Sequence, residues 1–298
     1  MKPAMTPTGA IAVLVAGLAF SLAGGNARAA ECAPARLSTV KTHSLPDGRI
    51  TLPVTVEGHA LSFLLDTGGV STTIKWDRAR EMGLPIQQTT RKLKGVGGSV
   101  LNFALAGENF SVGALRVENK PIYVESRPLP FADGTLGPDI LRDYDIEIDM
   151  AEGSLSLLAP GYCAPPEWSG SAVLAIDVDR SLHVRFPVKI DGATVVAALD
   201  TGSAISVIGM RAAARLGVYP GSPGLELLRD MGRYRIYSYP FQSLDIGGVT
   251  VKSPRIVIAS DGFIPGSDMV LGIDAIRQMR LAIAYGSKRL YIRGPQVN

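Results

Sequence analysis

The chain has 298 residues, with 30 lysines and arginines against 27 aspartates and glutamates, and a formal net charge of +3. So small an imbalance gives no electrostatic reason to expect a nucleic acid as the partner. The three histidines have no metal-ligand spacing among themselves or with the two cysteines, so we expect no metal site and no cofactor.

The first 29 residues are typical of a secretory signal peptide. Lys2 precedes an apolar run from Ile11 to Leu22, and Ala27-Arg28-Ala29 follows as a cleavage signature. The run is too short to cross a bilayer. We therefore expect an exported protein, periplasmic or secreted, with no membrane association after the signal is removed.

Cys32 and Cys163 are the two cysteines of the chain. Export makes a disulfide between them the default interpretation, because the count is even and the compartment is oxidising. Two unpaired thiols are the alternative. A lipid anchor on Cys32 is disfavoured, because Glu31 stands where such signals have a small residue.

The chain repeats itself after the predicted signal peptide. Asp66 and Asp200 are 134 positions apart (200 − 66 = 134), and the same shift pairs two sets of glycines, Gly58 with Gly192 and Gly83 with Gly217. This self-similarity indicates a duplication. Pro160-Gly161 and Pro165-Pro166 mark a linker between the halves. The predicted organisation is a signal peptide at 1–29, a first lobe at 30–159, a linker at 160–172 and a second lobe at 173–298.

Each half predicts the same elements in the same order. Residues 53–65 and 186–199 are each expected to form two short strands around a glycine-containing turn. Residues 76–82 and 210–216 have helical composition, and the glycine that follows each is placed to end a helix. Each half closes on an alternating strand, 144–150 and 280–285, and a final strand. The predicted class is mostly β.

An Asp-Thr-Gly triplet ends the second strand of each half. One such triplet is weak evidence, because Asp and Gly also serve ordinary turns. Two copies in register mean more, because other features match around them. Leu136 to Arg142 of the first half matches Leu271 to Arg277 of the second, each with a Leu-Gly-x-Asp segment.

These features resemble the aspartic peptidases, both the two-subunit retropepsins and the single-chain, two-lobed pepsins. The resemblance covers nearly all of the chain after the signal. It implies a bilobal acid-protease-like fold, with two β-barrel-like lobes related by pseudo-two-fold symmetry and one or two short helices in each. It also implies that Asp66 and Asp200 form the catalytic pair.

The same resemblance assigns supporting roles around this pair. Thr67 and Thr201 would bond backbone groups of the opposite lobe, and Gly68 and Gly202 would let the backbone approach the carboxylates closely. The residues after each triplet, Gly69 and Ser203, would also support the site. Family members often have Ser or Thr there, whose hydroxyl bonds an aspartate oxygen, so Ser203 fits and Gly69 departs.

Two further features depend on the resemblance. The glycine-rich turn Gly95, Val96, Gly97 and Gly98 looks like a retropepsin flap, and Tyr234 lies in its counterpart in the second half. Asp139 and Asp274 also repeat, but outside the triplet. We expect them to cap a helix or make local hydrogen bonds rather than to react.

The predicted function is an aspartic endopeptidase acting on peptide or protein substrates, a monomer whose lobes pair within one chain. A catalytically inactive protein that binds peptides or inhibits a partner through the same cleft is the alternative from another class. Pairing of the halves between two molecules also stays open. Serine or cysteine chemistry is set aside, because no Gly-x-Ser-x-Gly elbow accompanies the histidines.

Overall fold

The computed structural model describes residue 1 and residues 34–94, 100–105, 109–126, 129–178, 180, 182–231, 234–259 and 266–295. The chain divides into two units, Met1–Glu31 and Cys32–Asn298, and the fold below is that of the second. The predicted signal peptide after Met1, Cys32 and the flap turn at 95–98 lie outside the described residues. None of the helices described is long and apolar enough to cross a membrane.

The first half forms a ten-stranded sheet. Its order is β6-β7-β10-β5-β11-β4-β3-β8-β9, with β2 paired to β3. The bounds are β2 His43–Ser44, β3 Ile50–Val56, β4 His59–Leu65, β5 Thr73–Lys75, β6 Ile86–Lys94, β7 Val100–Leu105, β8 Phe110–Val112, β9 Leu115–Val117, β10 Tyr123–Glu125 and β11 Gly134–Leu136.

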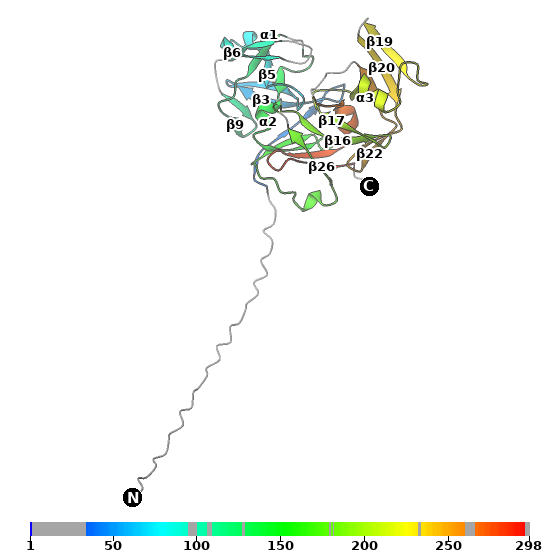
Figure 1. Ribbon diagram of the computed structural model, residues 1–298. Coiled ribbons are helices and arrows are strands. Elements are labelled where there is room, and N and C mark those ends of the chain that lie inside the picture. The colour runs from blue at the N-terminus through cyan, green and yellow to red at the C-terminus, as the bar shows by residue number, and fades with distance from the viewer. Residues whose placement is uncertain are drawn as a thin grey trace. The chain divides into compact units, whose positions relative to one another are not determined.

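The second half forms another ten-stranded sheet with the same order. The path is β19-β20-β23-β18-β24-β17-β16-β21-β22, with β15 paired to β16. Figure 1 shows the first half in blue to green and the second in yellow-green to red. The bounds are β15 Asp177–Val178, β16 Val184–Ile190, β17 Ala193–Leu199, β18 Val207–Gly209, β19 Glu226–Met231, β20 Tyr234–Pro240, β21 Ser243–Ile246, β22 Val249–Lys252, β23 Arg255–Ala259 and β24 Met269–Leu271.

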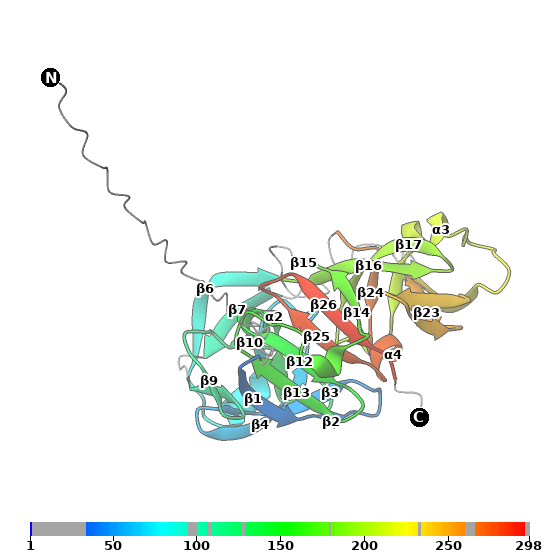
Figure 2. The same ribbon diagram turned by 90° about the horizontal axis from the view of Figure 1, so that it is seen from below.

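A third sheet takes strands from both halves. Its six strands run in the order β1-β13-β12-β25-β26-β14, so that β12 of the first half pairs antiparallel with β25 of the second (Figure 2). The order reads the same from both ends, which is the pseudo-two-fold symmetry that the duplication implied. The bounds are β1 Arg36–Lys41, β12 Asp145–Asp149, β13 Ser154–Leu158, β14 Ala172–Ala175, β25 Arg280–Ala284 and β26 Arg289–Arg293.

Four short α-helices are described, two in each half: α1 Trp76–Glu81, α2 Pro138–Leu141, α3 Met210–Arg215 and α4 Ile273–Ile276. Gly83 and Gly217 follow α1 and α3 with φ angles of +65° and +82°. A residue with a Cβ is strained in this left-handed conformation, so these glycines can end the helices as predicted.

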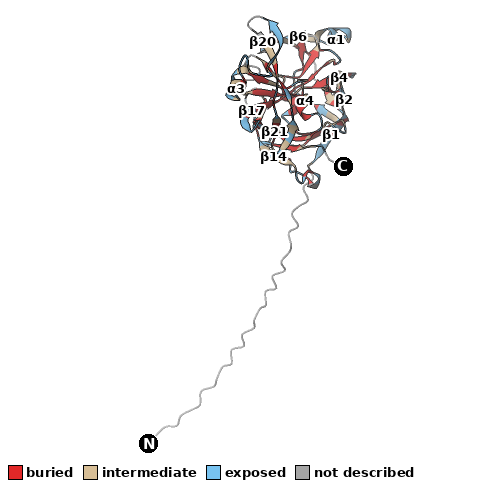
Figure 3. Cartoon of the chain, turned by 90° about the vertical axis from the view of Figure 1, so that its right-hand side faces the viewer, coloured by how far each residue is buried: buried red, intermediate tan, exposed pale blue. Residues whose placement is uncertain are grey.

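The mostly β, two-lobed fold is confirmed, but neither ten-stranded sheet closes into a barrel through the strands that the structure describes. Each path has two ends, at β6 and β9 in the first lobe and at β19 and β22 in the second. Buried residues gather in the inner strands, whereas β19 is exposed along its whole length (Figure 3). The hydrophobic core is continuous across both lobes and the six-stranded sheet.

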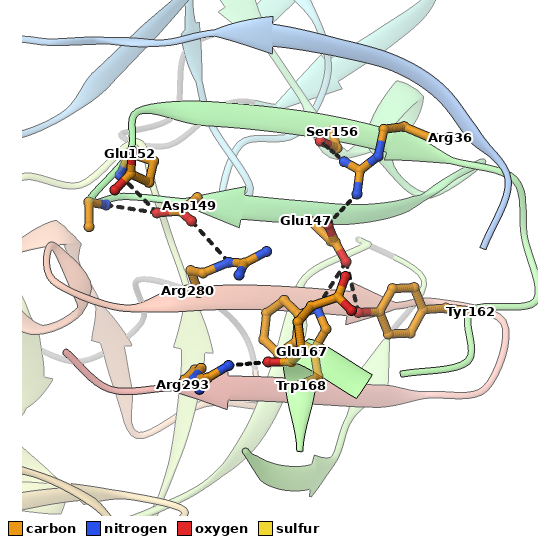
Figure 4. Close-up of polar contacts among 11 residues, drawn as sticks. Arg36, Glu147, Asp149, Glu152, Ser156, Tyr162, Glu167, Trp168, Arg280 and Arg293 are labelled. Carbon is orange, nitrogen blue, oxygen red and sulfur yellow. Dashed lines mark hydrogen bonds and ion pairs between the residues drawn. The ribbon is translucent and has the colours of Figure 1, made fainter. Parts of the chain in front are cut away.

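Glu147 of β12 fastens the linker segment to the six-stranded sheet. Its buried carboxylate accepts hydrogen bonds from the Tyr162 hydroxyl at 2.9 Å and from Trp168 Nε1 at 3.0 Å (Figure 4). Arg36 of β1 adds an ion pair at 3.1 Å. Burial and the neighbouring Glu147 raise the pKa of Tyr162 above its ordinary value. Such a buried carboxylate needs these partners to be tolerated.

Cys163 lies in this linker and is exposed. Its predicted partner, Cys32, lies outside the described residues, so the disulfide stays a prediction. The exact boundaries of the two lobes and the linker stay predictions as well.

Candidate active site

Each Asp-Thr-Gly turn begins where a buried strand ends. β4 pairs in parallel with β11, and the amide of Asp66 continues that ladder by donating to the carbonyl oxygen of Leu136 at 3.0 Å. In the second lobe β17 pairs in parallel with β24, and the amide of Asp200 donates to Leu271 at the same distance. The apolar strands therefore fix where both carboxylates emerge.

The two threonines lock the turns together across the lobes. The Thr67 hydroxyl donates to the carbonyl oxygen of Leu199 at 3.1 Å and accepts from the amide of Thr201 at 3.1 Å. The Thr201 hydroxyl donates to Leu65 at 2.8 Å and accepts from the amide of Thr67 at 3.1 Å. Both side chains are fully buried. The bonds that the resemblance implied are present, and they join two halves of one chain.

Gly68 and Gly202 bring each turn against the opposite carboxylate. A Cβ placed on Gly68 would lie 2.2 Å from Asp200 Cγ, and one on Gly202 would lie 2.4 Å from Asp66 Oδ1. Real Cβ atoms do not approach other atoms so closely. Only glycine can occupy these positions while the two carboxylates stay where they are.

The side chains of Asp66 and Asp200 lie next to each other, close enough to share a hydrogen bond when one of them holds a proton. Burial raises the pKa of Asp200 above its ordinary value; the amides of Gly202 and Ser203, the bond with Asp66 and the charge of His183 oppose that rise without cancelling it. The Gly202 amide donates to Asp200 Oδ1 at 2.9 Å. Two carboxyl groups so close cannot both ionise readily, so the pair can hold one proton and act as acid and base together; aspartic proteases are a standard example of this behaviour.

Two family models match the chain in tandem. The aspartyl protease model matches residues 52–140, and the model of the gag-polyprotein putative aspartyl protease matches residues 186–278. Each match contains one Asp-Thr-Gly turn. The chain is a duplicated member of the aspartic peptidase family.

Solved structures share the fold at low sequence identity. An aspartic proteinase from Irpex lacteus is similar with a TM-score of 0.58 and 16% identity, over 87% of this chain and 97% of that one. Conglutin gamma, a basic 7S globulin from lupine seeds, has a TM-score of 0.53 and 10% identity over 88% and 95%. Basic 7S globulin from soybean has 0.50 and 9% over 87% and 95%. No curated protein matches the sequence.

A proteinase and two seed globulins therefore share this aspartic peptidase fold. The fold by itself does not assign hydrolysis to the chain. The site must carry that argument.

The second pair of repeated aspartates holds the segments that follow the two Asp-Thr-Gly turns. Asp139 accepts hydrogen bonds from the Ser71 hydroxyl at 2.7 Å and from the Thr72 amide and hydroxyl at 2.7 and 2.8 Å. Asp274 accepts from the Ser206 hydroxyl at 2.6 Å. The local hydrogen bonds expected of Asp139 and Asp274 are therefore observed. The prediction that these aspartates cap a helix is wrong.

The residues before the two helices explain that correction. Gly137 and Gly272 occupy the N-cap positions of α2 and α4, and neither helix has a side-chain cap. Asp139 and Asp274 lie inside the first turn of each helix. From there their carboxylates reach the segments that follow the Asp-Thr-Gly turns.

The residues after the triplets differ from expectation in one respect. The Ser203 hydroxyl donates to the carbonyl oxygen of Ile205 at 2.8 Å and not to an aspartate oxygen; the Ser203 amide faces Asp200 instead. A Cβ on Gly69 would lie 2.7 Å from Asp66 Oδ2. Glycine at this position therefore gives the Asp66 carboxylate the room that it occupies.

Arg49 and His183 also reach the site, and the sequence analysis missed their roles. Arg49 Nη1 donates to the carbonyl oxygen of Gly202 at 3.5 Å, and His183 Nε2 lies 3.2 Å from the carbonyl oxygen of Gly68. The two residues are also 134 positions apart (183 − 49 = 134). The repeat offset could have paired them, but an arginine and a histidine do not look alike in a sequence.

A pocket of about 190 Å³ opens over the pair of carboxyl groups of Asp66 and Asp200, called the dyad below. It is lined by Asp66, Gly68, Gly69, Val70, Ser71, Thr73, Leu101, Glu125, Thr135, Asp200, Gly202 and Ser203. Leu101 belongs to β7, which pairs antiparallel with β6; the predicted flap residues lie between these strands in the sequence and outside the described residues. Tyr234 begins β20, which repeats β7 in the second lobe; its contact with a substrate stays a prediction.

Proposed function

We propose that this chain is an aspartic endopeptidase that hydrolyses peptide bonds with Asp66 and Asp200 as its catalytic pair. The observation that carries the proposal is the pair of adjacent carboxyl groups that line one pocket, with the glycine of the opposite turn packed against each carboxylate. A binding cleft does not need two adjacent carboxylates, whose mutual repulsion and burial cost stability.

The proposed mechanism follows from the shared proton. The ionised carboxylate removes a proton from a water molecule between the two groups, and that water attacks the carbonyl carbon of the scissile bond. The protonated carboxyl donates a hydrogen bond to the carbonyl oxygen, where negative charge develops in the tetrahedral intermediate. When this intermediate collapses, the C–N bond breaks, and the carboxyl that took the proton from water passes it to the leaving amine nitrogen. The roles belong to the pair, because the two groups titrate together.

The site geometry supports a rigid pair of carboxylates. The four hydrogen bonds between Thr67 and Thr201 and the opposite strands hold both turns. A nucleophilic water therefore meets groups that are already oriented, which lowers the entropic part of the barrier.

The test is cleavage of a denatured protein substrate across acidic to neutral pH, using purified wild-type protein beside Asp66→Asn and Asp200→Asn. We expect wild type to cut and each variant to lose activity by on the order of 10³-fold or more. Asp77 is an exposed aspartate of α1 in the first lobe, so Asp77→Asn is the matched control and should keep wild-type activity.

Wild-type protein that binds peptides but cuts none of them at any pH would contradict the proposal and favour an inactive peptide-binding protein. Circular dichroism of each variant separates loss of activity from loss of fold.

We also propose that the peptidase is exported and acts as a monomer. The signal-like first 29 residues support export. Pairing of β12 with β25, and of the two Asp-Thr-Gly turns, within one chain supports a monomeric site. Fractionation of cells that express the full chain, with N-terminal sequencing of the product, tests the first; light scattering tests the second.

A further inference from the structure

The pocket over the dyad is built unequally by the two lobes. The second lobe contributes Asp200, Gly202 and Ser203, which all belong to its Asp-Thr-Gly turn. The first lobe contributes its own turn and also side chains of β5, β7, β10 and β11. The wall beside Asp66 is therefore the part of the pocket that can distinguish one substrate side chain from another.

Polar side chains make up much of that wall. The Thr73 and Thr135 hydroxyls share a hydrogen bond of 2.9 Å between β5 and β11. Tyr123 lies opposite Thr73 in the parallel pair of β10 and β5, and Glu125 is two residues further along β10. Side chains two apart on a strand share a face, so Glu125 points to the same side as the two threonines. Glu125 is only 5% exposed.

The second lobe has apolar residues at the equivalent strand positions, and none of them lines this pocket. Val207 lies opposite Val270 in β18 and β24, where the first lobe has Thr73 opposite Thr135. Ala259 lies opposite Gly209 in β23 and β18, where the first lobe has Glu125 opposite Lys75. The fold therefore does not require a carboxylate at this position.

A buried carboxylate is costly, because it loses water. Glu125 also lines two further depressions, one of which it shares with Lys75. Its carboxyl group thus lines the pocket over Asp66 and Asp200 while protein covers most of its surface. In such a site a charge-assisted hydrogen bond to a cation is strong and selective.

We infer that Glu125 is a specificity-determining residue that receives the cationic side chain of a lysine or arginine next to the scissile bond. The inference rests on the proposed endopeptidase function.

The test is a peptide library cut by wild type, Glu125→Gln and Glu118→Gln. We expect wild type to favour lysine or arginine at one position beside the cut. Glu125→Gln should reduce that preference by about 10- to 100-fold, as expected for loss of a charge-assisted bond, while still cutting peptides without a basic residue there. Glu118 is an exposed glutamate of the same lobe, and its variant should keep the wild-type preference.

A wild type that cuts without a basic preference, or a Glu125→Gln variant that keeps it, would overturn the inference and leave the endopeptidase function standing. Complete absence of cutting would instead count against the proposed function. Binding then tests the inference on its own. Peptides retained by the full Asp66→Asn protein are resynthesised with lysine or arginine replaced by norleucine.

We expect at least tenfold weaker binding of the norleucine peptides, and equal binding of both in Asp66→Asn/Glu125→Gln. Equal binding in Asp66→Asn itself, or no retained peptide with a basic residue, overturns the inference. A Lys75→Met variant distinguishes direct substrate binding by Glu125 from an effect that Glu125 exerts through its neighbour Lys75. If Glu125 acted only through Lys75, Lys75→Met would change the thermal stability and the preference for basic residues together. We expect the preference to stay.

Discussion

The two lobes share one order of strands but differ in what they present to the pocket. Both keep the Asp-Thr-Gly turn, the cross-lobe threonine bonds and an aspartate in a short helix that holds the segment following the turn. They differ on the wall beside the turn, where Glu125 of the first lobe is replaced by Ala259 of the second. The features that both lobes share hold the two carboxyl groups in place. The residues beside the turn, which differ between the lobes, can select a substrate.

The largest effect is expected at the glycines that cross the lobes. Gly68→Ala would place a Cβ 2.2 Å from Asp200 Cγ, and Gly202→Ala would place one 2.4 Å from Asp66 Oδ1. Either carboxylate must move, so we expect kcat/KM to fall by about 10²- to 10³-fold. Gly286→Ala is the control, because nothing lies within 4 Å of its Cβ position. Activity within threefold of wild type in both variants would show that the close approach is unimportant.

The cross-lobe threonines should matter mainly for stability. Thr67→Val leaves the buried Leu199 carbonyl and Thr201 amide without their bonds, and Thr201→Val does the same to Leu65 and Thr67. Each change is expected to lower the free energy of unfolding by about 2–5 kcal/mol, measured by urea denaturation. Thr67→Ser and Thr201→Ser keep the hydroxyl and should cost clearly less. Equal losses for valine and serine would mean that packing, not hydrogen bonding, joins the turns.

The buried carboxyl of Asp200 should make stability depend on pH. Its pKa is raised by burial above the usual value of 3.8, so the folded protein binds the proton more tightly than the unfolded chain does. Stability from this group is complete below pH 3.8 and is lost as the pH rises through the folded-state pKa.

Asp200→Asn should therefore raise Tm at neutral pH by about 2–4 °C for each kcal/mol of burial cost removed. The gain should shrink as the pH falls toward 3.8. Thermal melts of wild type, Asp200→Asn and the exposed control Asp77→Asn across this range measure it. A gain that does not change with pH, or a loss at neutral pH, would contradict the assignment of burial as the dominant cause.

The smallest effect is expected when the first lobe is made to copy the second. Thr73→Val/Thr135→Val reproduces the Val207 and Val270 pair and removes both partners of one hydrogen bond. We expect the free energy of unfolding to change by less than about 1 kcal/mol, whereas Thr73→Val alone should cost about 1–2 kcal/mol. A double-mutant cycle measures this. Strictly additive losses would mean that the hydroxyls do not act as a pair.

The repeat made much of the fold predictable. Two matching runs of strand, Asp-Thr-Gly turn and short helix predicted two similar lobes, and Gly83 and Gly217 correctly marked the helix ends. The roles of Thr67 and Thr201 came from the family resemblance. No local sequence pattern predicts that their hydroxyls bond carbonyl groups 132 and 136 residues away.

The features that the sequence did not predict depend on strand pairings and turn geometry, which a sequence does not reveal. Glu125 acquires its place only because β10 lies parallel to β5, about 50 residues earlier in the chain. The Ser203 hydroxyl could bond either an aspartate or the nearby Ile205 carbonyl, and only the turn geometry decides between them. Asp139 suits an N-cap by composition, but Gly137 takes that position with φ −99° and ψ 175°.

The most direct test of the central claim is protein cleavage by Asp66→Asn, by Asp200→Asn and by an equimolar mixture of the two. We expect each variant to be inactive and the mixture to be inactive too, because one catalytic carboxylate must come from each lobe of the same chain. Wild-type protein, assayed beside them at the same total concentration, should cut. Cleavage by either single variant would contradict the catalytic pair, and activity restored in the mixture would contradict its formation within one chain.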